Sequence, residues 1–270
     1  MINKLVLSGG GINGIIYIGI FKYLETNKQL KYINNFVGSS IGAIINTLIC
    51  IGYSSQELEN FILSFKLDLI KNINIENIFT NYGIDNGHKL EIILKCFIRN
   101  KLKVDDITLY ELYQKTFKTN TIITTCLNDK KIIYLNHITH PNLNIIKALL
   151  MTSCIPLYFN PIKYNNKYYI DGCVLNHFGI NFFKKNDNSI FGVLLNENKN
   201  TININSFEFY IASIIELILT NTDIKYYNDP NILVIDYQYS VLNLDISNDN
   251  KNKMIDLGYE KANLFFKKNN

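Results

Sequence analysis

The sequence predicts an α/β fold in which helices cover both sides of a mixed, mainly parallel sheet. Three observations indicate this fold. Strand-like apolar runs alternate with helical patterns along the whole chain, several strand candidates end in glycine turns, and no internal repeat is visible. The 270 residues suffice for one large domain with a substantial core. We therefore expect a single domain over residues 1–270.

The chain opens with two predicted strand–turn–helix units. Lys4–Ser8 is an apolar run that stops at three glycines, and Ile12–Thr26 then places apolar residues at helical spacing. Asn35–Ser39 is a second strand candidate, followed by a Gly-Ser-Ser-Ile-Gly turn. Ile41–Gly52 is apolar nearly all round, which predicts a buried helix.

The middle of the chain is predicted to be helical and then β-rich. Helical patterns with recognisable starts occupy Ser55–Phe65, Asn86–Arg99 and Thr108–Phe117. Two β-rich runs flank Asn128 and Asp129 and predict a hairpin: Asn120–Cys126 and Lys131–Asn136.

The last part of the chain alternates strands with helices again. The predicted strands are Tyr164–Asp171, Ile190–Leu195 and Ile232–Tyr237. The predicted helices are Phe207–Thr220 and Lys253–Phe266. Asn-rich composition predicts solvated loops at Asn196–Asn205 and Asn248–Asn252.

Charge and cysteine content exclude several function classes. The formal charge of +4 is small, and the lysines are scattered rather than gathered into a basic stripe, so no nucleic-acid partner is expected. Five cysteines without CxxC spacing disfavour a disulfide framework and a zinc site, which fits a reducing intracellular setting.

Targeting and membrane signals are also weak. The N-terminus passes from one lysine into a strand-like run and a glycine turn, unlike a signal peptide. No segment has 18 or more consecutive apolar residues, so no transmembrane segment is expected. The protein is expected to be cytoplasmic or peripheral at a membrane.

The turn after the second strand has the form of a nucleophile elbow. Gly38-Ser39-Ser40-Ile41-Gly42 fits GxSxG, in which a serine occupies a sharp strand-to-helix turn between two glycines. That turn would put the Ser40 hydroxyl at the positive end of the next helix, where the Ile41 amide can face a developing oxyanion. The alternative is a glycine turn without a catalytic role.

The first glycine turn, Gly9–Gly14, has bare backbone amides between a strand and a helix. Such amides suit an oxyanion hole. Gly9, Gly11 and Gly14 also satisfy the GxGxxG pattern of pyrophosphate binding, but the second strand ends without the acidic residue that pattern expects. The oxyanion hole is favoured, while a nucleotide-binding loop and a plain turn stay open.

A serine nucleophile needs a proton acceptor, and the chain offers two late candidates. Ser40, Asp171 and His177 follow the chain order of a triad hydrolase, although the last two would share one short loop. Asp171 ends a predicted strand and precedes Gly172, so an Asp-Gly turn is its simplest explanation. A catalytic Asp171 would need to lie within hydrogen-bond reach of Ser40.

These three motifs in this order, GGGxxG, GxSxG and a late Asp-Gly after a strand, resemble the patatin-like phospholipase family. The similarity continues through VGSSIGAIINTLICIGYSSQELENFI, NYGIDNGHKLEIIL and ALLMTSCIPLYFNPIKYNNKYYIDGCVLNH. It covers about residues 3–180, and the remainder is expected to complete the fold.

The resemblance implies a three-layer α/β/α sandwich and hydrolysis of fatty acyl esters in phospholipids or neutral lipids, at a membrane surface and without metal or cofactor. It implies Ser40 as nucleophile and Asp171 as its base. The implied oxyanion hole consists of Gly10, Gly11 and the Ile41 amide, and the matching motif glycines are Gly9, Gly14, Gly38, Gly42 and Gly172. A patatin-like binding protein without catalysis is the alternative.

Three positions depart from the family pattern. Asn13 replaces a residue that is often Arg or Lys, which puts in doubt any charge contact of this position with a phosphate or a loop. Ile41 replaces a usually small residue and is expected to narrow the pocket, while its amide still serves. Cys173 stands where the family has Gly or Ala after Asp-Gly, a modest change expected to preserve the turn.

Overall fold

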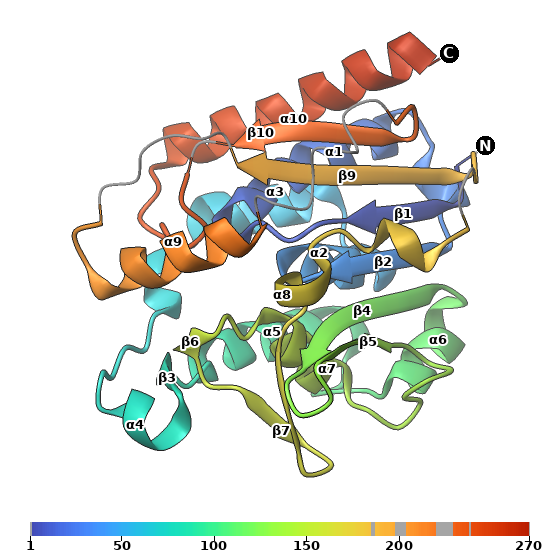
Figure 1. Ribbon diagram of the computed structural model, residues 1–270. Coiled ribbons are helices and arrows are strands. Elements are labelled where there is room, and N and C mark those ends of the chain that lie inside the picture. Colours follow the sequence, from blue (N-terminus) through green and yellow to red (C-terminus); the bar gives the residue numbers. More distant parts are fainter. Residues whose placement is uncertain (1, 185–186, 198–203, 220–228, 238, 270) are drawn as a thin grey trace.

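A mixed sheet of eight strands forms the centre of the protein in the computed structural model, which describes residues 2–184, 187–197, 204–219, 229–237 and 239–269. The sheet has the order β10-β9-β1-β2-β4-β8-β7, and β5 pairs with β4 beside this path (Figure 1). Its strands are β1 (Lys4–Leu7), β2 (Asn35–Ser39), β4 (Thr119–Cys126), β5 (Lys131–Leu135), β7 (Ile162–Tyr164), β8 (Lys167–Asp171), β9 (Ile190–Glu197) and β10 (Ile232–Tyr237).

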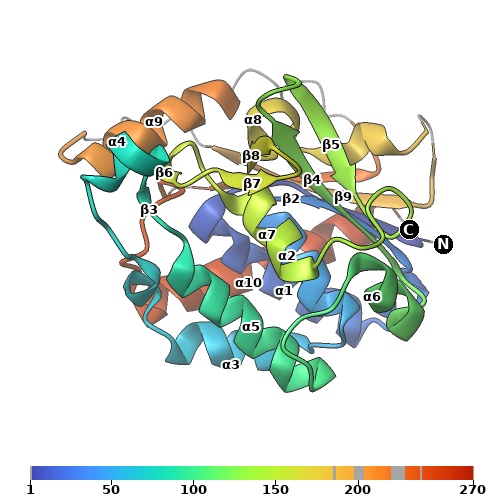
Figure 2. The same ribbon diagram turned by 90° about the horizontal axis from the view of Figure 1, so that it is seen from below.

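Helices lie on both faces of this sheet. Among the described residues they are α1 (Ile15–Thr26), α2 (Ile41–Cys50), α3 (Ser55–Ser64), α4 (Asn77–Asn81), α5 (His88–Leu102), α6 (Leu109–Thr116), α7 (Ile145–Ser153), α8 (Cys173–Asn176), α9 (Phe207–Leu219) and α10 (Asn248–Asn269). Figure 2 shows α1, α2 and α10 on one side of the sheet and α8 on the other. The three-layer α/β/α arrangement expected for the fold is confirmed.

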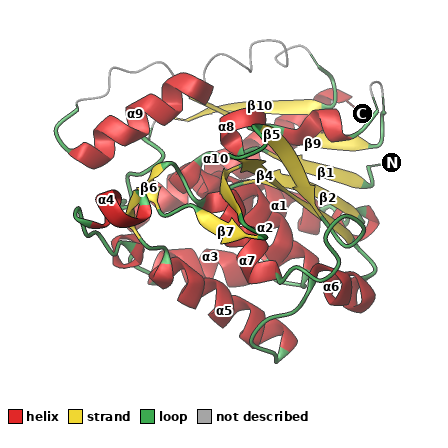
Figure 3. Cartoon of the chain, turned by 60° about the horizontal axis from the view of Figure 1, so that its bottom comes forward, coloured by secondary structure: helices red, strands yellow, loops and turns green. Residues whose placement is uncertain are grey.

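The strands run in the directions that the sequence predicts. The run β10-β9-β1-β2-β4 pairs parallel throughout, as buried strands joined by helices must. The predicted β4–β5 hairpin is present, and β8 pairs antiparallel with β4. A separate pair, β3 (Gly83–Asp85) with β6 (Leu157–Phe159), lies beside α4 (Figure 3).

Three predicted boundaries are wrong. The strand expected at Tyr164–Asp171 is a hairpin, because Asn165 and Asn166 adopt φ of 49° and 60° and turn the chain between β7 and β8. The loop expected at Asn248–Asn252 is the first turn of α10. The loop expected at Asn196–Asn205 is wrong for its first two residues, which belong to β9, while residues 198–203 lie outside the described residues.

Close packing of α10 against α1 explains why that Asn-rich segment is helical. A Cβ added to Gly258 would come within 2.1 Å of the Ile16 carbonyl, and one added to Gly19 within 1.8 Å of the Ile255 carbonyl. The two helices therefore touch backbone to backbone. Tertiary packing of this kind outweighs the weak helix propensity of asparagine.

Candidate active site

Ser40 lies on a strained turn between β2 and α2. Its φ of 51° and ψ of −126° are rare for a residue with a side chain, and such strain persists only where the surroundings hold it. The Ser40 amide donates a hydrogen bond to the Thr152 hydroxyl at 2.9 Å, and that hydroxyl donates in turn to the Ile123 carbonyl. α7 and β4 thus fix the turn from outside.

The sheet brings Asp171 to the same turn. Ser39 and Asp171 both pair with β4, opposite the consecutive residues Ile123 and Thr124. The Ser40 hydroxyl consequently lies 2.7 Å from Asp171 Oδ2, to which it donates a hydrogen bond. Neighbouring Ser39 is fully buried, and its hydroxyl lies 3.4 Å from the Cys173 thiol instead.

The Asp171 carboxyl group is buried and electrostatically perturbed. Loss of solvent raises its pKa above the ordinary value, and hydrogen bonds from the Cys173 amide and the Ser40 hydroxyl oppose that rise. The Cys173 amide donates to Oδ1 at 2.8 Å, which leaves Oδ2 for Ser40. A carboxylate held in this way can accept the proton of the serine hydroxyl.

The first glycine turn lies beside this pair. Gly10 and Gly11 border a small cavity of about 20 Å³ together with Ser40 and Asp171. Gly10 has φ of 150° and Gly11 has φ of 54°, conformations that glycine adopts readily. Among the described residues, no partner accepts from the amides of Gly10, Gly11 or Ile41, so these donors are available to an oxyanion.

The other motif glycines allow main chains to approach closely. A Cβ at each would lie within 2.6 Å of a neighbour: Gly9 meets Cys173, Gly14 meets Ile41, Gly38 meets Ala43, Gly42 meets Ser8 and Gly172 meets Ile123. Since backbone or short side chains stand at these points, larger residues would displace the turns. These glycines shape the site without contacting its small cavity.

Asn13 connects the glycine turn to the C-terminal part of the chain. Its side chain is buried and donates to the Gly10 carbonyl at 3.1 Å and to the Tyr239 carbonyl at 2.8 Å. The Ile12 amide adds a bond to the Val241 carbonyl at 3.2 Å. Where the family often has a cation, this chain has a neutral clamp between two backbone segments.

His177 does not stand between the serine and the aspartate. Its imidazole Nε2 lies 3.2 Å from the Leu195 carbonyl, and its own carbonyl accepts from the Gly9 amide. Because Ser40 and Asp171 touch directly, the geometry is that of a pair rather than a triad in which an imidazole separates hydroxyl from carboxylate.

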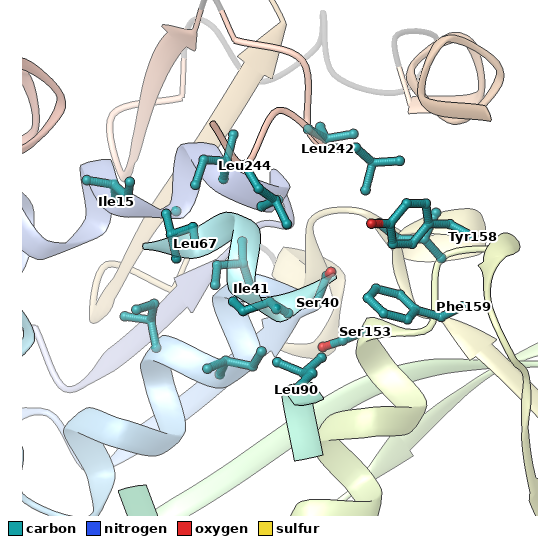
Figure 4. Close-up of a pocket in the computed structure, with 18 of the residues that line it drawn as sticks. Ile15, Ser40, Ile41, Leu67, Leu90, Ser153, Tyr158, Phe159, Leu242 and Leu244 are labelled. Atoms are coloured by element: carbon teal, nitrogen blue, oxygen red, sulfur yellow. The ribbon is translucent and has the colours of Figure 1, made fainter. Parts of the chain in front are cut away.

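An apolar pocket of about 180 Å³ opens beside Ser40. Isoleucines dominate its lining, among them Ile15, Ile41, Ile44 and Ile155, and Ser153 is one of few polar residues. Figure 4 shows Ser40 between Ile41 on one side and Tyr158 with Phe159 on the other. The Ile41 side chain is therefore part of the pocket wall, at the position where it was expected to narrow the pocket.

Sequence reasoning did not single out several residues that build this site. Thr152 holds the serine turn, and Val241, Leu242 and Leu244 line the pocket from the segment after β10. Thr152 lies in the stretch before Asp171 that resembles the family, and that similarity could have indicated a role for it in the site. The C-terminal segment carries no motif, so nothing in the sequence marks it.

Comparison with known proteins identifies the family. The model of the patatin-like phospholipase family matches residues 5–183. A probable lipid hydrolase of Invertebrate iridescent virus 6 is 29% identical over 98% of this chain and 89% of its own length. Triacylglycerol lipase 4 of Saccharomyces cerevisiae is 28% identical over 56% of this chain, which covers 17% of that protein.

Solved structures share the fold at low sequence identity. VipD of Legionella pneumophila aligns with a TM-score of 0.74 and 14% identity, over 99% of this chain and 67% of VipD. ExoU of Pseudomonas aeruginosa, solved in complex with SpcU, gives a TM-score of 0.57 and 17% identity over 99% of this chain and 52% of that one.

Proposed function

The chain belongs to the patatin-like phospholipase family, and we propose that it cleaves the acyl esters of lipids through a Ser40–Asp171 dyad and an acyl-enzyme. A lipid hydrolase activity follows from the family and its relatives. The observation that carries the finer proposal is the direct 2.7 Å hydrogen bond to a buried carboxylate from the hydroxyl of Ser40, which lines an apolar pocket.

Acylation would begin when Asp171 takes the hydroxyl proton and the Ser40 oxygen attacks the ester carbonyl. The amides of Gly10, Gly11 and Ile41 would hold the resulting oxyanion. Collapse of this intermediate breaks the ester bond, and the leaving alcohol takes the proton from Asp171. The acyl group stays on Ser40, and its chain occupies the isoleucine-lined pocket, where burial of methylene groups is favourable.

Deacylation would reuse the same groups. The Asp171 carboxylate takes a proton from a water molecule, which attacks the acyl ester, and the same oxyanion donors stabilise the charge. Collapse returns the proton to Ser40 and releases the fatty acid. No step in this sequence calls for a metal, a cofactor or an imidazole.

Labelling with a fluorophosphonate probe tests the nucleophile. We expect the wild type and His177→Ala to be labelled, and Ser40→Ala to be unlabelled although it folds. Hydrolysis of a soluble short-chain ester should fall by at least about 10³-fold in Ser40→Ala and Asp171→Asn. Activity close to that of the wild type in either of these two variants would exclude the dyad.

The same experiment separates the alternatives. A folded wild type that neither reacts with the probe nor hydrolyses any acyl ester would indicate a patatin-like binding protein without catalysis. Loss of activity in His177→Ala as severe as in Asp171→Asn would indicate a triad instead.

A further inference from the structure

Seven exposed apolar side chains gather on adjoining elements at the pocket end of the molecule. We call this set the apolar face, and we propose that it docks onto the zwitterionic surface of a phospholipid bilayer. Its members, with their exposed fractions, are Ile75 (64%), Phe79 (85%), Tyr82 (58%), Leu157 (44%), Phe207 (42%), Tyr210 (49%) and Leu217 (68%).

The elements that carry the apolar face are neighbours. α4 leads directly into β3, β3 pairs with β6, and α9 contacts β6. Figures 1, 2 and 3 all show α4 and α9 at the same end of the molecule, with β6 close to both. Phe207, Tyr210 and Leu217 project within about 80° of one another around α9, so they share one side of that helix.

The walls of the pocket have apolar residues on both sides. In β6, Tyr158 and Phe159 line the pocket while Leu157 faces solvent. In the single turn of 3-10 helix at Leu67–Ile70, Leu67 and Ile70 line the pocket while Leu69 is 55% exposed. An ordinary surface element is apolar only on the side that faces the core. Apolar side chains on the outward side of these two elements indicate that this side contacts an apolar environment outside the protein.

The occupant follows from what lies behind the apolar face. The wall separates it from a pocket that, under the proposed function, receives an acyl chain beside Ser40. A lipid whose acyl chain enters this pocket comes from a bilayer, whose interior is apolar directly below the headgroups. The proposal therefore rests on the proposed function, and it names the part of the chain through which the lipid phase is reached.

The elements of the face carry no excess of positive charge that would favour an anionic surface. Residues 66–82 carry Lys66 and Lys71 against Asp68 and Glu76, so their formal charges cancel, and α9 adds Glu208 and Glu216. A zwitterionic surface therefore suits the face better than an anionic one. Asn72, Asn74, Asn77 and Asn81 make residues 66–82 polar without adding a net charge. Contact through this face should depend on apolar burial and respond little to salt.

Cosedimentation with phosphatidylcholine vesicles tests the proposal without catalysis when all variants carry Ser40→Ala. We expect Phe79→Ser with Leu217→Ser to weaken partitioning about 10- to 100-fold, because each side chain loses burial in lipid. The matched control is Phe117→Ser with Leu264→Ser, whose side chains are 77% and 62% exposed. Phe117 follows α6 and Leu264 lies in the C-terminal half of α10, and Figures 1 and 2 show α6 and the C-terminus at the end of the molecule opposite α4 and α9. This control should bind as Ser40→Ala does, at low and at high salt.

Three outcomes would overturn the proposal. The first is that Ser40→Ala does not bind the vesicles, and the second is that both double variants bind equally. The third is that ultracentrifugation without lipid shows a dimer that dissociates only when Phe79→Ser and Leu217→Ser are introduced. The last outcome would assign the face to a second copy of this chain.

Activity measurements keep this proposal separate from the proposed function. With Ser40 present, Phe79→Ser with Leu217→Ser should hydrolyse a soluble ester at the wild-type rate and vesicle phospholipid more slowly. Vesicle binding without any ester hydrolysis would support docking and refute the hydrolase. Hydrolysis of a soluble ester by the wild type, together with no vesicle binding by Ser40→Ala, would refute docking and leave the hydrolase proposal standing.

Discussion

Asp171→Asn should make the protein more stable at neutral pH while abolishing its activity. The wild-type carboxyl group is buried, and loss of solvent raises its pKa above the unfolded value of about 3.9. Its contribution to stability is thus complete below the unfolded pKa and is lost as pH rises through the folded pKa. Asparagine has nearly the same shape and does not titrate.

The magnitude follows from two opposing effects. Burying an ionised carboxylate costs several kcal/mol even after relaxation. The two hydrogen bonds to it, from Ser40 and from the Cys173 amide, return roughly 2 kcal/mol more than neutral bonds would. Asparagine keeps both contacts, since its oxygen can accept from the Cys173 amide and its NH₂ can donate to the serine. We therefore expect a gain of about 1–3 kcal/mol at pH 7.

Urea unfolding of wild type and variant between pH 4 and pH 8 measures this difference. The two free energies of unfolding should be close at acid pH and separate in favour of the variant as pH rises. Asp85→Asn is the control: Asp85 is also buried, but both of its oxygens accept backbone amides, from Asn72 at 2.6 Å and Gly87 at 2.8 Å. An NH₂ group cannot accept either bond, so this control should lose about 1–3 kcal/mol. A less stable Asp171→Asn at pH 7, or a difference independent of pH, would refute the reasoning.

Two further predictions concern the contacts that bind distant segments together. Asn13→Ala removes the side-chain bonds to the Gly10 and Tyr239 carbonyls and should lower the free energy of urea unfolding by about 1–2 kcal/mol. On a soluble ester it should lower kcat more than it changes KM, and an unchanged kcat would show that Asn13 does not position the glycine turn. Lys251→Met removes a buried ammonium group that donates to the carbonyls of Ile62 and Phe65 at the end of α3. The free energy of unfolding, measured with heat or urea, should fall by roughly 2–4 kcal/mol, and a fall below about 1 kcal/mol would show that these bonds do not stabilise α10 against α3.

The parts of the site that could be predicted are those with strong local constraints. Ser40 needs a strand, a sharp turn and glycines where main chains meet, and all of these appear within five consecutive residues. Asp171 is different, since it lies 131 residues from Ser40 and an Asp-Gly pair has a simpler explanation. Its role was inferred from resemblance to the family, and the shared neighbour β4 is the physical reason that the two side chains meet.

The parts that could not be predicted depend on contacts between segments far apart in the chain. Asn248–Asn252 was expected to be a loop because its composition favours one, yet α10 begins there and buries Lys251. The close approach of Gly258 to α1 stabilises that helix, and no local pattern reports it. The division of the strand predicted at Tyr164–Asp171 could not be predicted either. Asn165 and Asn166 form a turn because both adopt left-handed conformations, and the sequence alone does not distinguish such a turn from two polar residues within a strand.

The site concentrates local features that are unfavourable by themselves, and neighbouring elements stabilise each of them. The positive φ of Ser40 is held by Thr152 from α7, and the buried charge of Asp171 is partly offset by the Cys173 amide from α8. The glycine turn is bound to the segment after β10 through Asn13 and Ile12. That segment also lines the pocket with Val241, so a displacement of it would alter the proposed oxyanion donors and the proposed acyl site together. If the proposed function holds, binding of an acyl chain and alignment of these donors should be coupled, although they involve different groups.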